Sequence, residues 1–145
     1  MVACDLRDAL SERDESFLAL TRSDLDITDQ RAVAKTIGDE RPTIIINCAA
    51  FTKVDDAEKD ERLANAINGS SVEFLAHAAN DVDALLVQIS TDFVFDGSKR
   101  TPYEVNDMTH PLSAGENARI LYAFSALGMI APCDPRGVKV QVKQK

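Results

Sequence analysis

The chain has 145 residues, 45% of them hydrophobic and 28% charged, which is typical of one soluble globular domain. Its formal net charge of −8 argues against nucleic-acid binding, because proteins that bind a phosphate backbone usually present a basic face. No segment approaches the ~20 apolar residues of a membrane span, and the first 15 residues are too charged for a secretory signal. We therefore expect a cytoplasmic protein that binds neither nucleic acid nor membrane.

Cysteine and histidine are few. Cys4, Cys48 and Cys133 are odd in number and lack metal-ligand spacing, which favours reduced structural thiols over a disulfide framework. Only His77 and His110 supply imidazoles. The composition therefore indicates no histidine-based metal site, and we assign no metal ligand.

The first third of the chain predicts a helix, a strand and a second helix. Residues 5–13 have a helical pattern, with no strand before them. The run "SFLALT", residues 16–21, is nearly continuous in apolar character, as strands buried on both faces of a parallel sheet are. Thr28 or Asp29 can then cap a helix that ends within residues 38–42.

The middle of the chain repeats the alternation. Residues 43–48, "TIIINC", and residues 84–90, "ALLVQIS", are further apolar runs that predict strands. Between them, residues 60–80 have helical spacing, and Gly69 marks an expected bend. The order strand, helix, strand, helix, strand predicts an α/β fold, a Rossmann-like parallel sheet with flanking helices.

A nucleotide-binding half of this kind normally begins with a strand that runs into a glycine-rich turn. The first glycine of this chain is Gly38, so no loop that cradles a pyrophosphate can be assigned. Two alternatives follow. Either the protein binds no dinucleotide, or its first strand and glycine loop are absent from this chain.

Ligands of open α/β sheets bind beyond the carboxyl ends of the strands, where this chain has "TRSDLDIT", "NCAAFT" and "STDFVFDG". Ala49 and Ala50 are small enough for a flat ring to approach the backbone, and Asp26 could accept a hydrogen bond from an adenine amino group. The plain alternative for "NCAAFT" is a turn into the next helix. For Ser90 and Thr91 the plain alternative is the end of a strand, where their hydroxyls satisfy hydrogen bonds of the strand ladder.

About three quarters of the chain, residues 6–112, resembles the nucleotide-binding part of dTDP-4-dehydrorhamnose reductases, in the extended short-chain dehydrogenase/reductase superfamily. The matching pieces, in the order and spacing of the family, are "DLDITD", "RPTIIINCAAFTKVDDAEKD", "LANAIN", "ISTDFVFDG" and "PYEVNDMTHPL". The resemblance implies a partial NAD(P)-binding Rossmann-like domain over residues 1–112.

The resemblance also implies a cofactor, NADPH or NADH, and residues that contact it. Two of them border the adenine, and the rest lie near the ribose and the nicotinamide. The cofactor-binding set is Asp26, Ile27, Ala49, Ala50, Phe51, Thr52 and Ile89. Arg22 could favour the 2′-phosphate of NADPH, as an arginine there does in similar folds, and the plain alternative is an ordinary surface arginine. No motif here supports Mg²⁺.

The catalytic hydroxyl implied by the resemblance is that of Thr91, which would hydrogen-bond the 4-keto oxygen of the sugar. Asp92 would contact the same substrate, a dTDP-linked keto sugar. The chemistry requires such donors because negative charge develops on the carbonyl oxygen as hydride arrives.

The pattern breaks after Leu112. In the family a tyrosine follows, which delivers the proton, and a lysine stands four residues later and lowers the pKa of that tyrosine. Here those positions fall near Gly115 and at Ala118 or Arg119. Arginine can mimic the charge of lysine but supplies no phenolic proton.

Residues 113–145 resemble no part of the family and are expected to form a helix and a basic tail. From residue 114 onward the net charge is +3, against −11 before it. Our hypothesis is that a shifted reading frame or an alternative exon produced this segment. Translation of the coding DNA in the other two frames after codon 112 tests the idea, which fails if neither frame gives Tyr-x-x-x-Lys.

The function implied by the resemblance is NAD(P)H-dependent reduction of a dTDP-4-keto-deoxysugar to dTDP-rhamnose. Without the glycine loop, tyrosine and lysine, this chain is expected to be impaired or inactive. One alternative is a non-catalytic binding protein, like the reductase-related regulatory subunit of methionine adenosyltransferase. Another is a truncated, non-functional product. A homodimer and a regulatory partner both stay open.

Overall fold

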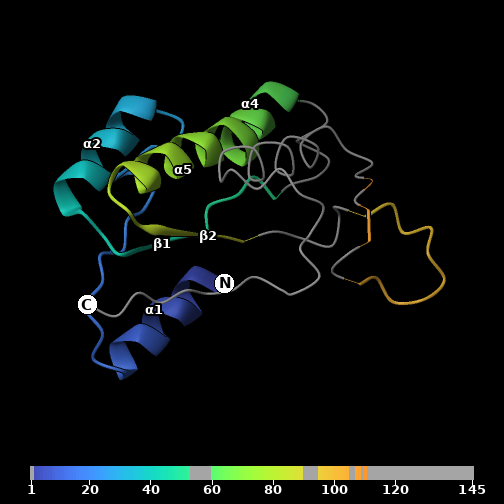
Figure 1. The fold of residues 1–145 in the computed structure, drawn as a ribbon, viewed down its shortest axis with the longest axis horizontal. Helices are drawn as coiled ribbons and strands as arrows, with labels where there is room; N and C mark the ends of the chain where they lie inside the picture. Colours follow the sequence, from blue (N-terminus) through green and yellow to red (C-terminus); the bar gives the residue numbers. More distant parts are fainter. Residues whose placement is uncertain (1, 53–59, 90–94, 105–106, 109, 111–145) are drawn as a thin grey trace.

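The computed structural model describes residues 2–52, 60–89, 95–104, 107–108 and 110 (Figure 1). Its elements, in chain order, are α1 (Val2–Glu12), α2 (Gln30–Glu40), β1 (Ile44–Asn47), α4 (Glu61–Asn65), the π-helical turn η1 (Ala66–Ser70), α5 (Ser71–Asp81) and β2 (Leu85–Gln88). Within these residues no helix combines the length and apolar character needed to cross a bilayer.

The strands β1 and β2 are parallel neighbours, and their register runs from Ile44 opposite Leu85 to Asn47 opposite Gln88. The two predicted runs at 43–48 and 84–90 are therefore confirmed as strands. Helices α2 and α5 lie together over one face of this sheet (Figure 1). The expected α/β class with a parallel sheet is confirmed.

The core lies between that sheet face and the two helices. Side chains of a strand alternate between its faces, so the partners Ile45 and Leu86 both point toward the helices. They meet Val33 and Ile37 of α2, which are 0% and 5% exposed, and Leu75 of α5. The burial of these apolar side chains fixes the helices on the sheet.

Helix α2 begins where the sequence predicts. Asp29 is its N-cap, and the carboxylate accepts hydrogen bonds from the backbone N–H groups of Arg31 and Ala32. The helix ends within the predicted range, because Arg41 takes the left-handed conformation, with φ of 44°, just before Pro42.

The predicted helix over residues 60–80 is also present, but in three parts. Asp60 caps α4 by accepting from the N–H of Leu63. Helix α4 leads into η1, and η1 into α5. Gly69, the expected bend, lies inside the π-helical turn. A π-helical turn widens the helix by one residue and turns the following side chains toward a different direction.

One prediction is wrong: residues 16–21 do not form a strand. A strand is stable only beside a hydrogen-bonded neighbour, and in the described part of the chain β1 and β2 pair with each other alone. Phe17, Leu18 and Leu20 are accordingly 41%, 58% and 43% exposed. Residues 16–21 have the apolar character of a buried strand, but apolar character alone does not supply the neighbouring strand that would bury them.

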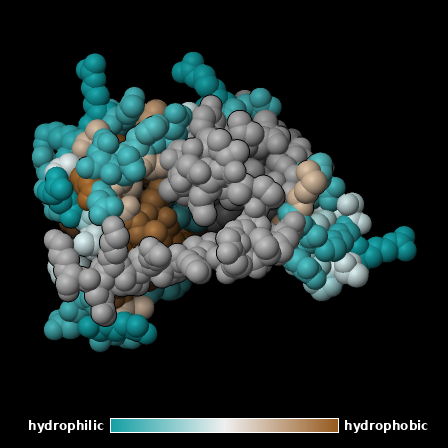
Figure 2. Space-filling view, in the orientation of Figure 1, coloured by the Kyte–Doolittle hydropathy of each residue, from teal (hydrophilic) through white to brown (hydrophobic). Residues whose placement is uncertain are grey.

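Helix α1 confirms the helical pattern at 5–13 and starts earlier, at Val2. None of its residues is buried. The second face of the sheet stays open as well, since Ile44 and Ile46 are 44% and 38% exposed. Figure 2 shows hydrophobic side chains gathered in the part of the view occupied by the strands in Figure 1.

Candidate functional site

The carboxyl edge of the sheet is built by two side-chain amides. Asn47 and Gln88 are register partners, and Nδ2 of Asn47 donates to Oε1 of Gln88 at 2.8 Å. Gln88 in turn donates from Nε2 to the carbonyl of Ile89 at 2.9 Å. Asn47 is 6% exposed, so this pairing satisfies a buried polar group and fixes where the two strands end.

The segment after β1, residues 48–52, starts in a turn that Asn47 organises. Its Oδ1 accepts from the N–H of Ala49 at 3.0 Å. Ala49 and Thr52 are exposed, and Ala50 is partly buried. The expected cofactor residues Ala49, Ala50 and Thr52 therefore follow the carboxyl end of β1, and the side chains of Ala49 and Ala50 are small.

Ile89 follows β2 at the same edge, and its N–H donates to the carbonyl of Asn47 at 3.4 Å. Its side chain is 36% exposed. The structure thus brings Ile89 beside the start of segment 48–52, as parallel pairing requires.

Asn68 holds segment 48–52 from the helical side. The N–H of Phe51 donates to Oδ1 of Asn68 at 2.8 Å, and Nδ2 of Asn68 donates to the carbonyl of Phe51 at 3.0 Å. Asn68 is 3% exposed and belongs to η1. One buried amide therefore occupies both backbone groups of Phe51.

Two further polar side chains mark this π-helical region. Ser71, which is 0% exposed, donates its hydroxyl to the carbonyl of Ile67 at 2.5 Å. Oδ1 of Asn65 is buried and has no hydrogen-bond partner within the described part of the chain. An unpaired buried acceptor costs free energy, and such atoms are rare in native structures.

The predicted adenine-binding residues lie in a turn before α2. Oδ1 of Asp26 accepts from the backbone N–H and the hydroxyl of Thr28, at 3.0 and 2.7 Å. These two hydrogen bonds lower the pKa of Asp26, and Arg22 lowers it slightly further. Ile27 packs against the core, while the Asp26 side chain is exposed. An ionised, exposed carboxylate here can accept a further hydrogen bond.

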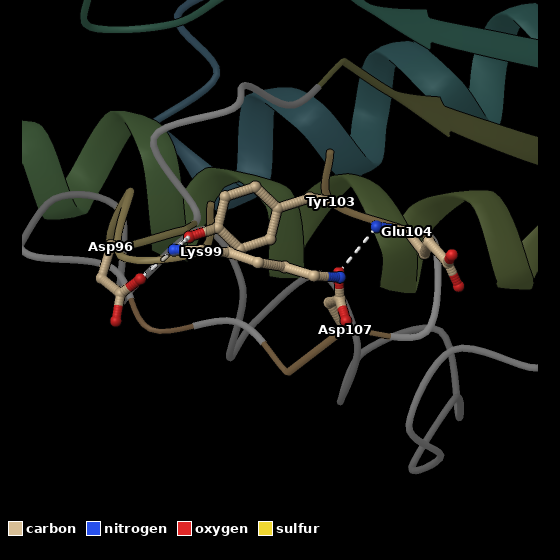
Figure 3. A network of polar contacts seen from close by, with 5 residues as sticks. All are labelled: Asp96, Lys99, Tyr103, Glu104 and Asp107. Atoms are coloured by element: carbon tan, nitrogen blue, oxygen red, sulfur yellow. Dashed lines mark hydrogen bonds and ion pairs between the residues drawn. The ribbon is translucent and has the colours of Figure 1, made fainter. Parts of the chain in front are cut away.

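Residues 96–107 are expected to form a loop, and their described part contains neither helix nor strand. Tyr103 organises it (Figure 3). Its ring stacks on Phe95 with centroids 4.2 Å apart, and its hydroxyl donates to Oδ1 of Asp96 at 3.0 Å. The N–H of Lys99 donates to the same hydroxyl at 3.2 Å. The Tyr103 hydroxyl is therefore engaged in hydrogen bonds within the loop. No contact of the described residues indicates that it donates a proton in place of the family's tyrosine.

Two carboxylates of this loop have lowered pKa values. Hydrogen bonds from Ser98 lower the pKa of Asp96 most, followed by the one from Tyr103. Asp107 pairs with Nζ of Lys99, which lowers its pKa, and also accepts from the N–H of Glu104 at 2.7 Å. Both carboxylates thus act as structural acceptors that close the loop.

Several predicted positions lie outside the described residues. They include the catalytic Thr91, the substrate contact Asp92 and the whole segment 113–145. The carboxylates Asp55, Asp56 and Glu58, expected at a helix N-terminus, also belong to this group. The side chain of His77 in α5 is 63% exposed and lies 3.7 Å from a Glu73 oxygen.

The structure adds three residues that sequence reasoning missed: Asn47, Gln88 and Asn68. Asn47 and Gln88 are polar within otherwise apolar runs, and this interruption is the signal in the sequence. Asn47 and Gln88 end apolar runs at equivalent places. Asn68 stands between Ile67 and Gly69 on the buried side of a helix. None of these positions reveals its partner, because each partner is 17 or 41 residues distant.

Comparison with known proteins shows which family this chain resembles. Residues 1–121 match the family described as the RmlD substrate binding domain. A dTDP-4-dehydrorhamnose reductase of Streptomyces griseus is 43% identical over 111 residues, covering 77% of this chain and 36% of that protein. The chain thus spans well under half the length of this relative.

Solved structures agree. A dTDP-4-dehydrorhamnose reductase from Clostridium acetobutylicum matches with a TM-score of 0.79 and 36% identity, over 88% of this chain and 45% of that one. The Bacillus anthracis reductase, in complex with NADP, matches with a TM-score of 0.78 and 33% identity, over 86% and 44%. The expected Rossmann-like fold is confirmed, and the chain belongs to the dTDP-4-dehydrorhamnose reductase family.

Proposed function

We propose that this chain is the nucleotide-binding part of a reductase that uses NADPH or NADH to reduce the 4-keto group of a dTDP-linked deoxysugar, a step of dTDP-rhamnose formation. The observation that carries the proposal is the edge formed by Asn47, Gln88 and segment 48–52, in a chain of this family. The complex of the Bacillus anthracis relative with NADP supports the choice of cofactor.

The described residues fit one part of such a cofactor. Ala49 and Ala50 leave room for a ring or ribose against the backbone, and Thr52 offers an exposed hydroxyl. No glycine precedes Gly38, so the sequence contains no glycine loop for the pyrophosphate. The remaining predicted contacts are Asp26 and Ile27 for the adenine, and Phe51 and Ile89 beside the ribose and nicotinamide.

When bound, the cofactor supplies the hydride. In this proposal Thr91 donates a hydrogen bond to the sugar's keto oxygen, and Asp92 contacts the sugar. These donors stabilise the charge that develops on that oxygen. The family's tyrosine and lysine have no counterpart after Leu112, so we expect nucleotide binding with little or no turnover.

Nucleotide binding is tested by titration of the 145-residue chain with NADPH. The key variant is Ala49→Leu, which places a branched side chain where the ring would approach. We expect at least a fivefold loss of affinity. Ala9→Leu, at an exposed position of α1, is the matched control and should bind like the unmodified chain. Equal affinity in both variants would show that segment 48–52 does not hold the nucleotide.

The cofactor preference has its own test. Arg22 is exposed and interacts electrostatically with Asp26, the residue proposed to border the adenine, and this proximity supports a contact with the 2′-phosphate. Arg22→Ala should lower the affinity for NADPH several-fold and leave that for NADH unchanged. A parallel loss for both cofactors would contradict this role.

An assay of turnover distinguishes an active enzyme from the non-catalytic alternatives. The expected result is no substrate-dependent oxidation of NADPH with a dTDP-4-keto-6-deoxysugar. Measurable oxidation would overturn the expectation of inactivity. A stoichiometric partner recovered by pull-down, without nucleotide binding, would favour the regulatory-subunit alternative instead. The domain boundary at residue 112, a homodimer and the cytoplasmic location stay predictions.

A further inference from the structure

We infer that Asn68 is a positioning residue: its side-chain amide sets the backbone conformation of segment 48–52 and so shapes the surface that receives the nucleotide. The part concerning the nucleotide rests on the proposed function. The part concerning the backbone rests on contacts of Asn68 alone.

The first step is geometric. Phe51 lies beyond the end of β1, outside the ladder that β1 forms with β2 in the described part of the chain. A partly buried N–H and C=O still need partners. Asn68 provides both, at 2.8 and 3.0 Å, from a single planar amide. This two-point contact restrains the rotation of the Phe51 backbone as well as its position.

The second step concerns the support of Asn68 itself. It lies in η1, where the helix is widened, and its side chain is almost fully buried. The hydroxyl of Ser71 donates to the carbonyl of Ile67, beside Asn68 in the chain, and thereby satisfies a backbone acceptor of this turn. π-helical turns are rare and frequently occur at functional sites. Burial of Asn68 within this hydrogen-bonded turn therefore restricts the conformations open to its side chain.

The third step is chemical. An amide presents an acceptor and a donor to one residue in this way, whereas an ionised carboxylate has no donor and an alanine has neither. At position 68 a carboxylate would accept from the Phe51 N–H but repel the Phe51 carbonyl. Once protonated, it would regain the donor. Asn68→Asp should therefore behave as a pH-dependent version of the native residue.

The experiment compares Asn68→Asp and Asn68→Ala with Asn80→Asp, which adds the same charge at an exposed position of α5. Hydrogen exchange gives the protection factor of the Phe51 amide, and calorimetry gives the affinity for NADP⁺, both from about pH 5.5 to 8. The carboxyl introduced at position 68 starts from an ordinary pKa of about 3.9, and burial raises it toward this range. Urea unfolding confirms that each variant is folded.

We expect Asn68→Asp to lose Phe51 protection and NADP⁺ affinity together as the pH rises, reaching a loss of roughly tenfold or more. Asn68→Ala should show the loss at every pH, and Asn80→Asp at none. If Asn68→Ala does not fold, the pH profile of Asn68→Asp decides alone.

Two results would overturn the inference. One is unchanged Phe51 protection in every folded Asn68 variant. The other is lost protection with unchanged NADP⁺ affinity, which would make the contact purely structural. Failure of the unmodified chain to bind NADP⁺ would refute the proposed function, while the Phe51 amide would still show whether Asn68 holds the backbone.

Discussion

Asn47 and Gln88 face each other across the carboxyl ends of β1 and β2, joined by a 2.8 Å hydrogen bond between their side chains. Asn47 also accepts from the N–H of Ala49, and Gln88 donates to the carbonyl of Ile89. The pair therefore connects the two strands and orients the segments that follow them. The proposed nucleotide edge depends on it.

Gln88→Leu should destabilise the protein. The substitution removes the acceptor for Nδ2 of Asn47 and leaves a buried donor unpaired, at a cost of about 1–3 kcal/mol in the free energy of unfolding. Urea denaturation measures the loss. Gln30→Leu, at an exposed position, is the control. Adding Asn47→Leu tests the pair itself, because the double variant should lose less than the two single losses combined. Strict additivity would argue against the interaction.

Asp29→Ala should lower the free energy of unfolding by about 1 kcal/mol, because α2 loses its N-cap. Its carboxylate accepts from two backbone N–H groups at 2.9 and 3.1 Å. Asp29→Asn is the matched control, since asparagine caps helices about equally well and differs only in charge. A similar loss in both variants would assign the effect to charge rather than to the cap. Thermal and urea unfolding both measure this change in the free energy of unfolding.

Arg41→Gly should stabilise the protein. Arg41 has φ of 44°, in the left-handed region that costs an L-residue about 1–2 kcal/mol. Glycine avoids this cost but loses about 0.5–1 kcal/mol of chain entropy, so a net gain of up to about 1.5 kcal/mol remains. Differential scanning calorimetry should show a higher Tm. Gly38→Ala, inside α2, provides a comparison in which helix propensity alone changes. A lower Tm for Arg41→Gly would contradict this prediction.

Tyr103→Phe should raise the pKa of Asp96 part of the way toward its ordinary value. The hydrogen bond from Tyr103 is removed, while those from Ser98, which contribute most, remain. A lowered carboxyl pKa stabilises the fold above the unfolded-state pKa, and this contribution is lost as pH falls through the folded-state value. The variant should therefore lose its Asp96 contribution at a higher pH.

Carbon-13 NMR titration of the aspartate carboxyls measures this change. Lys99→Gln is the crossed control, because it should raise the pKa of Asp107 and leave that of Asp96 unaffected. An unchanged Asp96 titration in Tyr103→Phe would mean that the hydroxyl contributes nothing in solution.

Local signals determined much of the architecture. Asp29 marks the start of α2 because its carboxylate caps neighbouring backbone groups, a contact within three residues. The apolar runs at 43–48 and 84–90 predict their strands because short, nearly continuous apolar runs rich in β-forming residues favour strands of a parallel sheet. Family membership also followed from motifs read directly in the sequence.

The tertiary structure decided which of these signals took effect. Residues 16–21 are an apolar run like β1 and β2 but lack a hydrogen-bonded neighbour within the described chain, so no strand forms. The partners of Asn47 and Asn68 are far along the sequence, and only the register of β1 on β2 and the packing of η1 bring them together. Helix caps and helical faces depend on residues close together in the sequence, so the sequence alone determined them. Strand pairing and the hydrogen bonds of buried amides join segments that are distant in the sequence, so only the tertiary structure decided them.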